Sequence, residues 1–288
     1  MSSDEQLPAA WEPLTPRGVA AFAHAKWGRL WLVQLLVAVA AAAGLAWAIH
    51  SCWFGIISAA VDHLPAQGSI RGGKLLWDTD SPQVLAENRF LAITVDLDHQ
   101  GQARSPAHLQ VEFGRSRVRV FSLLGFLDRA YPRGYTIAFN RAELIPWWGA
   151  WAPAFLAIIV GGAVAGLLGV WQVLAVLYAP AAWLVAFFAN RSLTFRQAIR
   201  LAGAALMPGA LAMLAAILFY ALALLDPIQL LAALALHFVL GWVFVFVSPF
   251  FLPRHPEAPA SPRQNPFDRT KPAAPTPDGT GAQPKTGI

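Results

Sequence analysis

The sequence predicts an α-helical polytopic membrane protein with a small β-rich extracytoplasmic domain. Four long runs contain no Asp, Glu, Lys or Arg: Leu30 to Val61, Leu144 to Asn190, Leu201 to Leu225 and Pro227 to Pro253. Each exceeds the roughly 20 apolar residues that cross a hydrocarbon core as a helix. The charged share of the whole chain, 13%, is well below the roughly 25% of soluble domains. One region between the runs differs: residues 62–146 carry ten Lys or Arg and nine Asp or Glu.

The chain begins with a mixed polar segment, residues 1–29, which ends in basic residues. We expect it to be a cytoplasmic N-terminal segment, followed by a first transmembrane helix over 30–61. That apolar run is too long for the hydrophobic region of a cleaved signal peptide, so it is interpreted as an uncleaved signal anchor.

Residues 62–146 are predicted to form the extracytoplasmic β-rich domain. Alternating polar and apolar stretches at 108–113 and 117–121, joined by Gly114–Ser116, indicate a hairpin. Further strands are expected at 90–97 and 135–139. The apolar side chains of the hairpin should face a small core: Leu109, Val111, Phe113, Val118 and Val120. Glu112 should then oppose Arg117 or Arg119 on the solvated face.

Residues 147–253 are predicted to form a transmembrane helical bundle. The run from Leu144 is too long for one perpendicular crossing, so it crosses once and continues along the interface, or it crosses twice. Pro180 favours a break after about residue 178. The basic residues Arg191, Arg196 and Arg200 favour four spans, because they then share the cytoplasm with both chain ends. Five spans remain the alternative.

This threading implies a multi-pass protein of the bacterial inner (plasma) membrane with a cytoplasmic N-terminus. The last segment, residues 254–288, has eight prolines and few large apolar residues. It is expected to be a disordered tail, because it cannot bury enough apolar surface to offset its chain entropy.

Polar residues inside spans are functional candidates, since they are costly to place in lipid. Two lie well inside predicted spans, Gln34 and His237, while His50 and Gln172 lie nearer span ends. His237 could relay a proton or bind a ligand, but a hydrogen bond to a neighbouring helix is favoured. No Asp, Glu, Lys or Arg lies mid-span, which argues against a proton-coupled transporter built on a buried carboxylate.

Small residues and prolines mark further positions in the bundle. Gly162 and Gly166 form a GxxxG step that allows close helix approach, and intramolecular packing is favoured over homodimerisation. Pro208 with Gly209, and Pro249, should kink or end their helices.

The β-rich region holds two pairs of closely spaced carboxylates, Asp78 with Asp80 and Asp96 with Asp98, the second followed by His99. Such groups suit a hard cation or acid–base work, but the neighbouring turn residues favour turn capping. Arg115, Arg117 and Arg119 could meet anionic headgroups, although a solvated strand face is favoured.

No zinc-ligand spacing, phosphate-binding loop or nucleophile motif is present in the sequence. We therefore assign no catalytic, cofactor-binding or metal-binding residue. The basic residues are scattered without a recognition motif, so nucleic acid is not expected as a partner.

Several short motifs carry a family resemblance over residues 60–250: Gly68-Ser-Ile-Arg-Gly-Gly-Lys-Leu75, Asp96-Leu-Asp98, Tyr131-Pro132, Asn190-Arg-Ser-Leu-Thr-Phe195 and Arg200-Leu-Ala-Gly-Ala-Ala-Leu-Met-Pro208. With them the chain resembles an uncharacterised bacterial multipass membrane family, sometimes labelled maltodextrin-utilisation protein and distantly similar to Yip-type membrane proteins. The resemblance implies a single span, an outer β-rich domain and a helical bundle. It implies no catalytic residues.

The favoured function is that of a non-enzymatic integral membrane protein. Its partners would be the lipid bilayer and a protein that the extracytoplasmic domain binds or senses. The alternative is a transporter or permease component with a site near Pro180 and His237. An enzyme that uses Asp96, Asp98 or His99 is the least favoured hypothesis.

Overall fold

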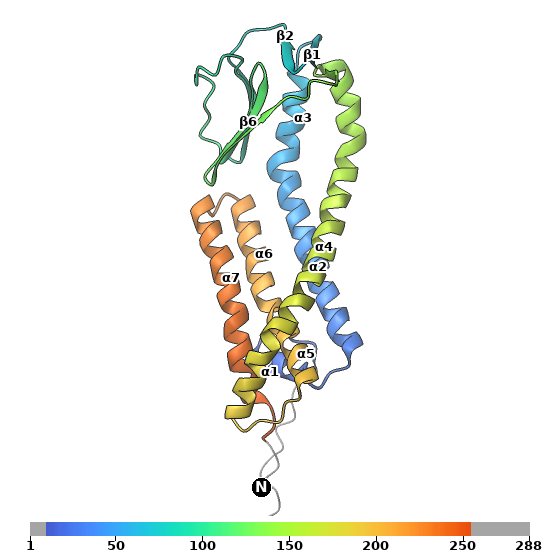
Figure 1. Ribbon diagram of the computed structural model, residues 1–288, viewed down its shortest axis with the longest axis vertical. Helices are drawn as coiled ribbons and strands as arrows, with labels where there is room; N and C mark the ends of the chain where they lie inside the picture. Colours follow the sequence, from blue (N-terminus) through green and yellow to red (C-terminus); the bar gives the residue numbers. More distant parts are fainter. Residues whose placement is uncertain (1–9, 255–288) are drawn as a thin grey trace, which may run out of the picture. The chain divides into compact units, whose positions relative to one another are not determined.

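The computed structural model describes residues 10–254 (Figure 1). Its helices are α1 (Pro16–Ala21), α2 (Trp27–Ile49), a π-helical turn η1 (His50–Phe54), α3 (Gly55–Asp62), α4 (Arg141–Phe188), α5 (Phe195–Ala205), α6 (Met207–Ala221), α7 (Pro227–Val247) and the 3-10 turn η2 (Ser248–Phe251). Its strands are β1 (Gly68–Arg71), β2 (Lys74–Trp77), β3 (Gln83–Glu87), β4 (Leu91–Val95), β5 (Leu109–Phe113), β6 (Arg117–Ser122), β7 (Gly125–Ala130) and β8 (Ile137–Ala138).

Four helical stretches are long and apolar enough to cross a membrane. They run over Trp27–Asp62, Arg141–Phe188, Phe195–Ala221 and Pro227–Phe251. They coincide with the four charge-free runs, so the predicted fold class is confirmed at this level: four long apolar helices and a separate small β domain. The predicted tail, apart from Arg254, lies outside the described residues.

Helices α4, α5 and α7 begin after residues whose side chains cap them. The Asp226 side chain accepts a hydrogen bond from the backbone N–H of Gln229, and the Gln229 side chain accepts one from the backbone N–H of Asp226. Thr194 and Gln197 form the same reciprocal pair before α5. Asn140 caps α4 through the backbone N–H of Glu143. Each cap satisfies backbone donors that the first helical turn leaves unpaired.

The predicted break near Pro180 is wrong, because α4 is one continuous helix of 48 residues that contains Pro146, Pro153 and Pro180 (Figure 1). A proline removes only one backbone donor, and apolar helices tolerate it when their neighbours accommodate the freed carbonyl. The helix also starts at Arg141, so the β domain ends six residues before the predicted boundary at 146.

The interruption occurs one span later than expected, next to Pro208. Leu206 separates α5 from α6, and Pro208 occupies the first turn of α6. Gly209 then allows close approach of α7, since an added Cβ there would lie 2.5 Å from the carbonyl oxygen of His237. The predicted kink at Pro208 and Gly209 is therefore present, as is the change of helix type at Pro249, which lies within η2.

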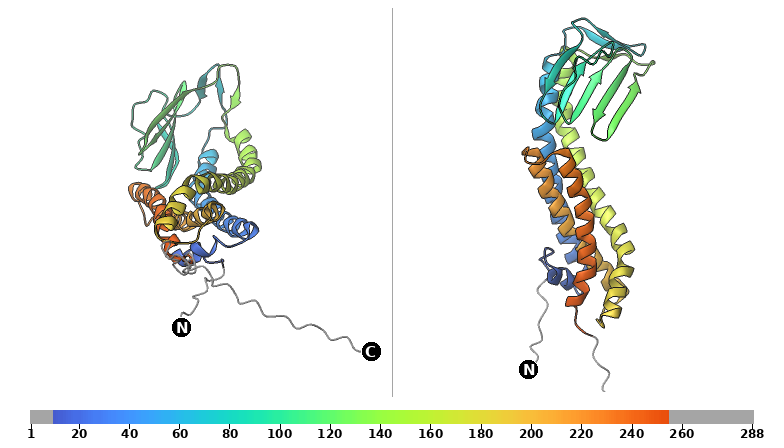
Figure 2. Two further views of the ribbon diagram at one scale, coloured as in Figure 1. Left: turned by 60° about the horizontal axis from the view of Figure 1, so that its bottom comes forward. Right: turned by 90° about the vertical axis from the view of Figure 1, so that its left-hand side faces the viewer.

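The β domain consists of two sheets, in the order β2-β1-β8 and β3-β4-β5-β6-β7. The predicted hairpin is confirmed: β5 and β6 pair antiparallel, with Glu112 opposite Arg119. Strands β4 and β5 are parallel and are joined by the long loop 96–108. In Figure 2 the strands of the larger sheet lie side by side, with β7 at one margin.

The prediction that Glu112 lies on the solvated face of the hairpin is wrong. Glu112 and Gln110 are 2% and 6% exposed, whereas Leu109, Val111 and Phe113 on the other face are only half-buried. The reason is the loop 96–108, which covers the polar face: the Gln110 side chain donates to the Ala103 carbonyl and accepts from the Ser105 backbone N–H. Alternation alone could not show that a crossover loop would cover that face.

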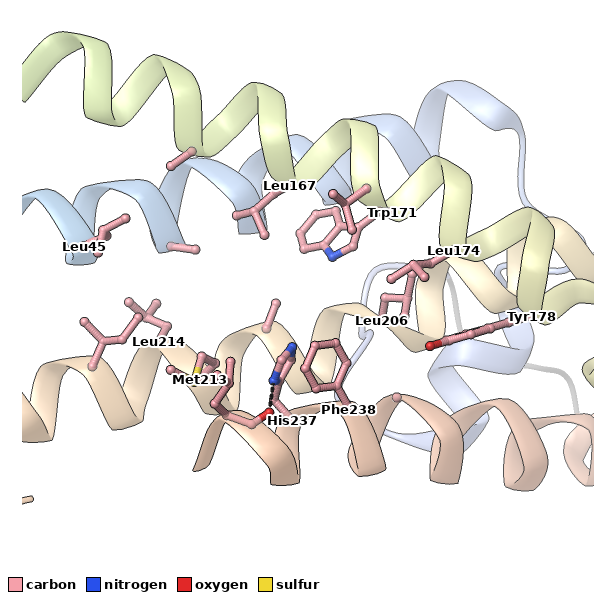
Figure 3. Close-up of a pocket in the computed structure, with 17 residues that line it drawn as sticks. Leu45, Leu167, Trp171, Leu174, Tyr178, Leu206, Met213, Leu214, His237 and Phe238 are labelled. Carbon is pink, nitrogen blue, oxygen red and sulfur yellow. Dashed lines mark hydrogen bonds between the residues drawn. The ribbon is translucent and has the colours of Figure 1, made fainter. Parts of the chain in front are cut away.

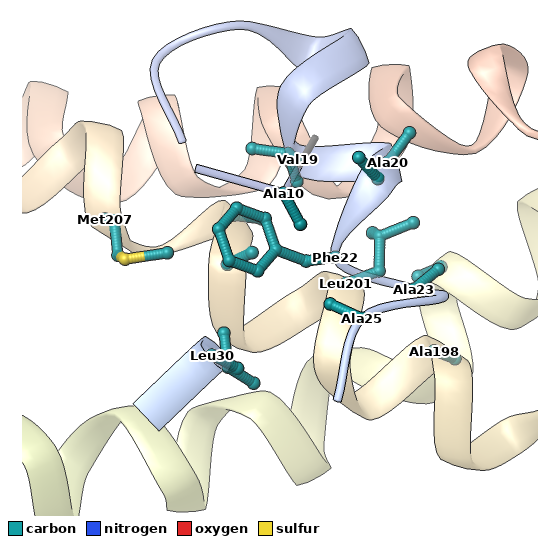
Figure 4. Packing of buried hydrophobic residues seen from close by; sticks show 14 of the residues in the cluster. Ala10, Val19, Ala20, Phe22, Ala23, Ala25, Leu30, Ala198, Leu201 and Met207 are labelled. Carbon is teal, nitrogen blue, oxygen red and sulfur yellow. The ribbon is translucent and has the colours of Figure 1, made fainter. Parts of the chain in front are cut away.

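Buried apolar residues form two clusters. One lies in the β domain, where Ile70, Leu75 and Val95 pack with Ala60 at the end of α3. The other joins the helices to the segment before α2, as Figure 4 shows for Phe22, Leu201 and Met207, all fully buried. Helix α1 within this segment was not predicted. Its residues are packed, because Val19 and Ala20 are also fully buried.

The chain segments that the threading assigned to one side of a membrane meet at one end of the bundle. Arg200 donates to the Ala25 carbonyl, and Arg191 donates to the Leu252 carbonyl. We call this the basic end. The opposite end, where α6 finishes and α7 begins, contacts the β domain and is called the domain end.

Candidate functional site

The predicted candidate His237 lines a cavity inside the bundle (Figure 3). The cavity has a volume of about 400 Å³ and is enclosed by residues of α2, α4, α6 and α7. Its wall is almost entirely apolar, with Leu45, Leu167, Met213, Leu214 and Phe238 among the lining residues. A volume of this size and an apolar lining are typical of small-molecule sites.

His237 does not make the hydrogen bond to a neighbouring helix that the sequence favoured. Its Nδ1 atom bonds instead to the carbonyl oxygen of Leu234 on its own helix. Among residues 10–254, its Nε2 atom has no hydrogen-bond partner. The ring therefore presents one open nitrogen within an apolar cavity.

Aromatic side chains from α4 complete the wall opposite His237. Trp171 is 4% exposed and reaches the cavity from α4, and Tyr178 lies two turns further along (Figure 3). The Tyr178 ring packs on Trp242 of α7 with centroids 4.3 Å apart, which joins α4 and α7 at this level. Sequence reasoning missed both residues, since an aromatic inside an apolar run gives no signal of the cavity it lines.

Gln34, the second candidate, is structural in its contacts. It is fully buried, donates to the Gly203 carbonyl at 3.2 Å, and accepts from the Gln172 side chain at 3.0 Å. It thereby connects α2 with α5 and α4.

Gly162 and Gly166 do not pack against another helix. An added Cβ at either position meets no atom within 4 Å, so the intramolecular contact favoured from the sequence is absent at these glycines. Both lie on the exposed side of α4. Homodimerisation through this step stays a prediction.

His50 begins the π-helical turn η1 and lines a groove that η1 and α3 form with α4. This groove also includes Ser51, Ser58 and Trp148, whose indole donates to the Ser58 hydroxyl at 2.9 Å. π-helical turns are frequent at functional sites, but this one also lies where the chain passes from α2 to α3 and on to the β domain.

The carboxylates of the β domain form a buried polar cluster. Ligand atoms of Asp96, His99 and Glu112 lie within 4.8 Å of one another, a separation that a metal ion could bridge. However, Arg119 and His99 already bind the same Glu112 oxygen, at 2.8 and 2.6 Å. Asp96 accepts from the backbones of Gln100 and Gly101, which confirms the predicted turn capping.

Of the other predicted carboxylates, Asp98 forms an exposed ion pair with Arg115 at 3.0 Å, whereas Asp78 and Asp80 are exposed. Arg117 pairs with the half-buried Asp128. Such pairs contribute little to stability. The arrangement suits a structural role: the buried cluster holds the loop 96–108 against β5, and the surface pairs line its rim.

A second contact region, absent from the predictions, joins the β domain to the domain end of the bundle. His108 and Tyr220 are hydrogen-bonded at 2.8 Å between Nδ1 and the hydroxyl oxygen. Phe90 packs edge-on against Tyr220 with ring centroids 5.2 Å apart. Burial and the nearby Arg89 guanidinium lower the pKa of His108, while Asp226 acts in the opposite sense.

Two further hydrogen bonds reach the helix ends from the β3–β4 turn. Asn88 donates to the backbone oxygen of Cys52 at 2.8 Å, and Arg89 donates to the backbone oxygen of Ala223 at 2.9 Å. Cys52, the one cysteine of the chain, is 4% exposed beneath this contact. We call the contact formed by Asn88, Arg89, Phe90 and His108 the docking contact. Two of these side chains bond to backbone atoms, and the other two contact Tyr220, which lies more than a hundred residues away, so residue spacing could not indicate the contact.

No family model, curated protein or solved structure matches this chain.

Proposed function

We propose that this chain is a non-enzymatic integral protein of the bacterial inner membrane whose β domain binds a partner protein on the outer face. The observation that carries the proposal is the free, apolar edge of strand β7. The cytoplasmic assignment of the N-terminus rests on Arg191, Arg196 and Arg200, which lie at the basic end. The family resemblance drawn from the sequence stays a prediction.

Strand β7 is the last strand of the five-stranded sheet, so one side of its backbone has no strand neighbour within residues 10–254. Three apolar side chains of the β6–β7 hairpin are strongly exposed: Leu124 at 82%, Phe126 at 71% and Leu127 at 51%. Soluble sheets usually protect such an edge with charge or proline. Strand β7 carries its charged residues, Asp128 and Arg129, only in its second half. Its apolar first half suits an extended peptide segment of a partner, which would add a strand and bury these side chains.

Binding at the β domain can affect the helices because the domain is not attached by flexible linkers alone. The docking contact joins it to the ends of α2 and α6 through three hydrogen bonds. A partner that shifts the β domain must therefore break or rearrange contacts at Cys52, Tyr220 or Ala223. Binding of the partner at the β domain would therefore be transmitted through the docking contact to the helical bundle.

Site-specific photo-crosslinking in intact cells tests the proposal. A photoreactive residue in place of Phe126 should give a discrete crosslinked species, and the variant Leu127→Ser should reduce its yield. Leu76 on β2 is the matched control, since it is an exposed leucine, 53%, on the other sheet. Equal crosslinking from both positions, or none from Phe126, would contradict the proposal.

A transport role is the second candidate, and the bundle cavity favours it. His237 and the interruption at Leu206 both border the cavity, and interrupted helices build substrate sites in many transporters. Pro180 does not mark such an interruption, because α4 is continuous there. Flux measured in proteoliposomes should fall in His237→Ala if this role holds, and unchanged flux would count against it.

A further inference from the structure

We propose that the bundle cavity binds a neutral lipid with a free hydroxyl group, which donates a hydrogen bond to Nε2 of His237. This proposal is independent of the partner at β7. It rests on the protonation pattern of His237, on the polar groups that face the cavity, and on the shape and openings of the cavity.

The hydrogen-bonding pattern of His237 selects the ligand group. A backbone carbonyl oxygen can only accept, so Nδ1 must donate its proton to Leu234. In the neutral imidazole Nε2 is then a bare acceptor. The residues that line the cavity include no carboxylate to balance an imidazolium, and an unpaired charge among apolar side chains is costly. The ligand must therefore supply a donor.

The opposite wall supplies the complementary group. Trp171 carries an indole N–H, which can only donate, and this N–H has no hydrogen-bond partner among residues 10–254. Figure 3 shows Trp171 on α4 and His237 on α7 on opposite sides of the cavity. A hydroxyl is the small neutral group that both donates and accepts. A ketone, an ester or an ether cannot donate to Nε2.

The cavity is elongated along the bundle. On the α6 side its lining runs from Leu206 to Ile217, which corresponds to about 16 Å at the helical rise per residue. On the α4 side it runs from Ala163 to Tyr178. A slot of this form, lined by apolar side chains, fits a hydrocarbon chain better than a compact polar solute.

The cavity is also accessible from the side of the bundle. Val170 and Phe238 line it and are 54% and 51% exposed, so the slot opens between α4 and α7. The packed rings of Tyr178 and Trp242 join the two helices towards the basic end. A lipid could therefore enter laterally without passing through either end of the bundle.

The depth of His237 argues against an ordinary phospholipid. It lies midway along α7, ten residues from each end of Pro227–Val247. A charged phospholipid head stays at the membrane surface, and its chains carry no donor at this depth. A neutral hydroxyl lipid, such as a diacylglycerol or an isoprenoid alcohol, can place its one polar group here, because a single hydroxyl costs far less to bury than a charge.

Equilibrium binding to the full-length protein in nanodiscs tests the proposal. Radiolabelled oleyl alcohol is the probe, and oleyl methyl ether is the matched compound without a donor. We expect saturable binding in which the alcohol binds roughly three- to tenfold more tightly than the ether. His237→Phe should bring the two affinities together. Equal affinities in the unaltered protein would overturn the role of the hydroxyl.

A blocking variant tests the place of binding without relying on His237. Ala163→Phe should fill the cavity and abolish saturable binding, whereas Ala165→Phe, an exposed position on the same helix, should leave it unchanged. Binding that survives Ala163→Phe would overturn the site. Competition with 1,2-dioleoylglycerol and with farnesol then distinguishes the two sources of the hydroxyl, and failure of both to compete would overturn the proposed ligand class.

Discussion

The two ends of the helical bundle are built differently. At the basic end, a short helix before α2 packs apolar side chains into the bundle, and Phe22, Val19 and Leu201 are fully buried. At the domain end, the contact to the β domain includes three hydrogen bonds and two ring contacts, of Phe90 and His108 with the half-buried Tyr220.

This difference indicates at which end of the bundle the packed segments can separate from the helices. At the basic end, separation would expose buried apolar side chains to water, which cannot replace the contacts that they lose. This end should therefore act as a fixed anchor. Hydrogen bonds at the domain end can exchange with water at small net cost. A domain held in this way can separate from the end of α6 and return while it stays packed on α3, which the proposed partner-binding role requires.

The largest expected effect is at the basic end. Phe22→Ala should lower the free energy of unfolding by about 3–5 kcal/mol, because it removes a fully buried ring and leaves a cavity. Unfolding of the purified protein, followed by tryptophan fluorescence, measures the change. Leu14→Ala is the control, since Leu14 is 61% exposed nearby. Similar losses in both variants would show that this end is no anchor.

An intermediate effect is expected for the polar bridge inside the bundle. A double-mutant cycle on Gln34→Leu and Gln172→Leu should give a coupling energy of about 0.6–1.7 kcal/mol, the range for hydrogen bonds between membrane helices. The same unfolding assay applies. A coupling near zero would mean that the Gln34 bond to Gly203, rather than the side-chain pair, carries the contact.

A smaller effect should appear at the domain end, where Cys52 is a native reporter. Asn88→Ala removes the hydrogen bond to Cys52, worth about 1 kcal/mol, together with the two turn bonds that its side-chain oxygen accepts from Phe90 and Leu91. The docking contact should therefore open at least roughly fivefold more often. The rate at which a small maleimide labels Cys52 should rise by the same factor. Glu87→Ala is the control, as Glu87 is the exposed neighbour of Asn88. An unchanged rate in Asn88→Ala would show that the domain is held elsewhere.

The sequence predicted the parts of the fold that depend on composition and periodicity. Charge-free runs located the four long helices, and alternation located the β5–β6 hairpin with Glu112 opposite Arg119. These features are local, so a window of residues contains the signal.

The errors concern contacts between distant segments. Pro180 did not break α4, and the face of Glu112 was inverted by a loop that crosses over it. The docking contact and the cavity arise where residues more than a hundred positions apart meet, as His108 and Tyr220 do. For the candidate site, the sequence identified His237 but gave no sign of Trp171 on the facing helix.

The smallest predicted effect is a pH dependence of the docking contact. Burial and Arg89 lower the pKa of His108 below its usual value near 6.5. Between the lowered pKa in the docked domain and the usual pKa near 6.5, the separated domain binds more protons than the docked one. Docking is therefore favoured above pH 6.5 and weakens as the pH falls below it. His24 at the basic end also has a pKa lowered by burial and by Arg200, so it responds in the same direction.

The comparison with His108→Gln at each pH isolates the domain end. Cys52 labelling in the unaltered protein, relative to labelling in this variant, should be higher at pH 5.5 than at pH 7.5. A ratio that does not change with pH would assign any acid sensitivity to the basic end instead.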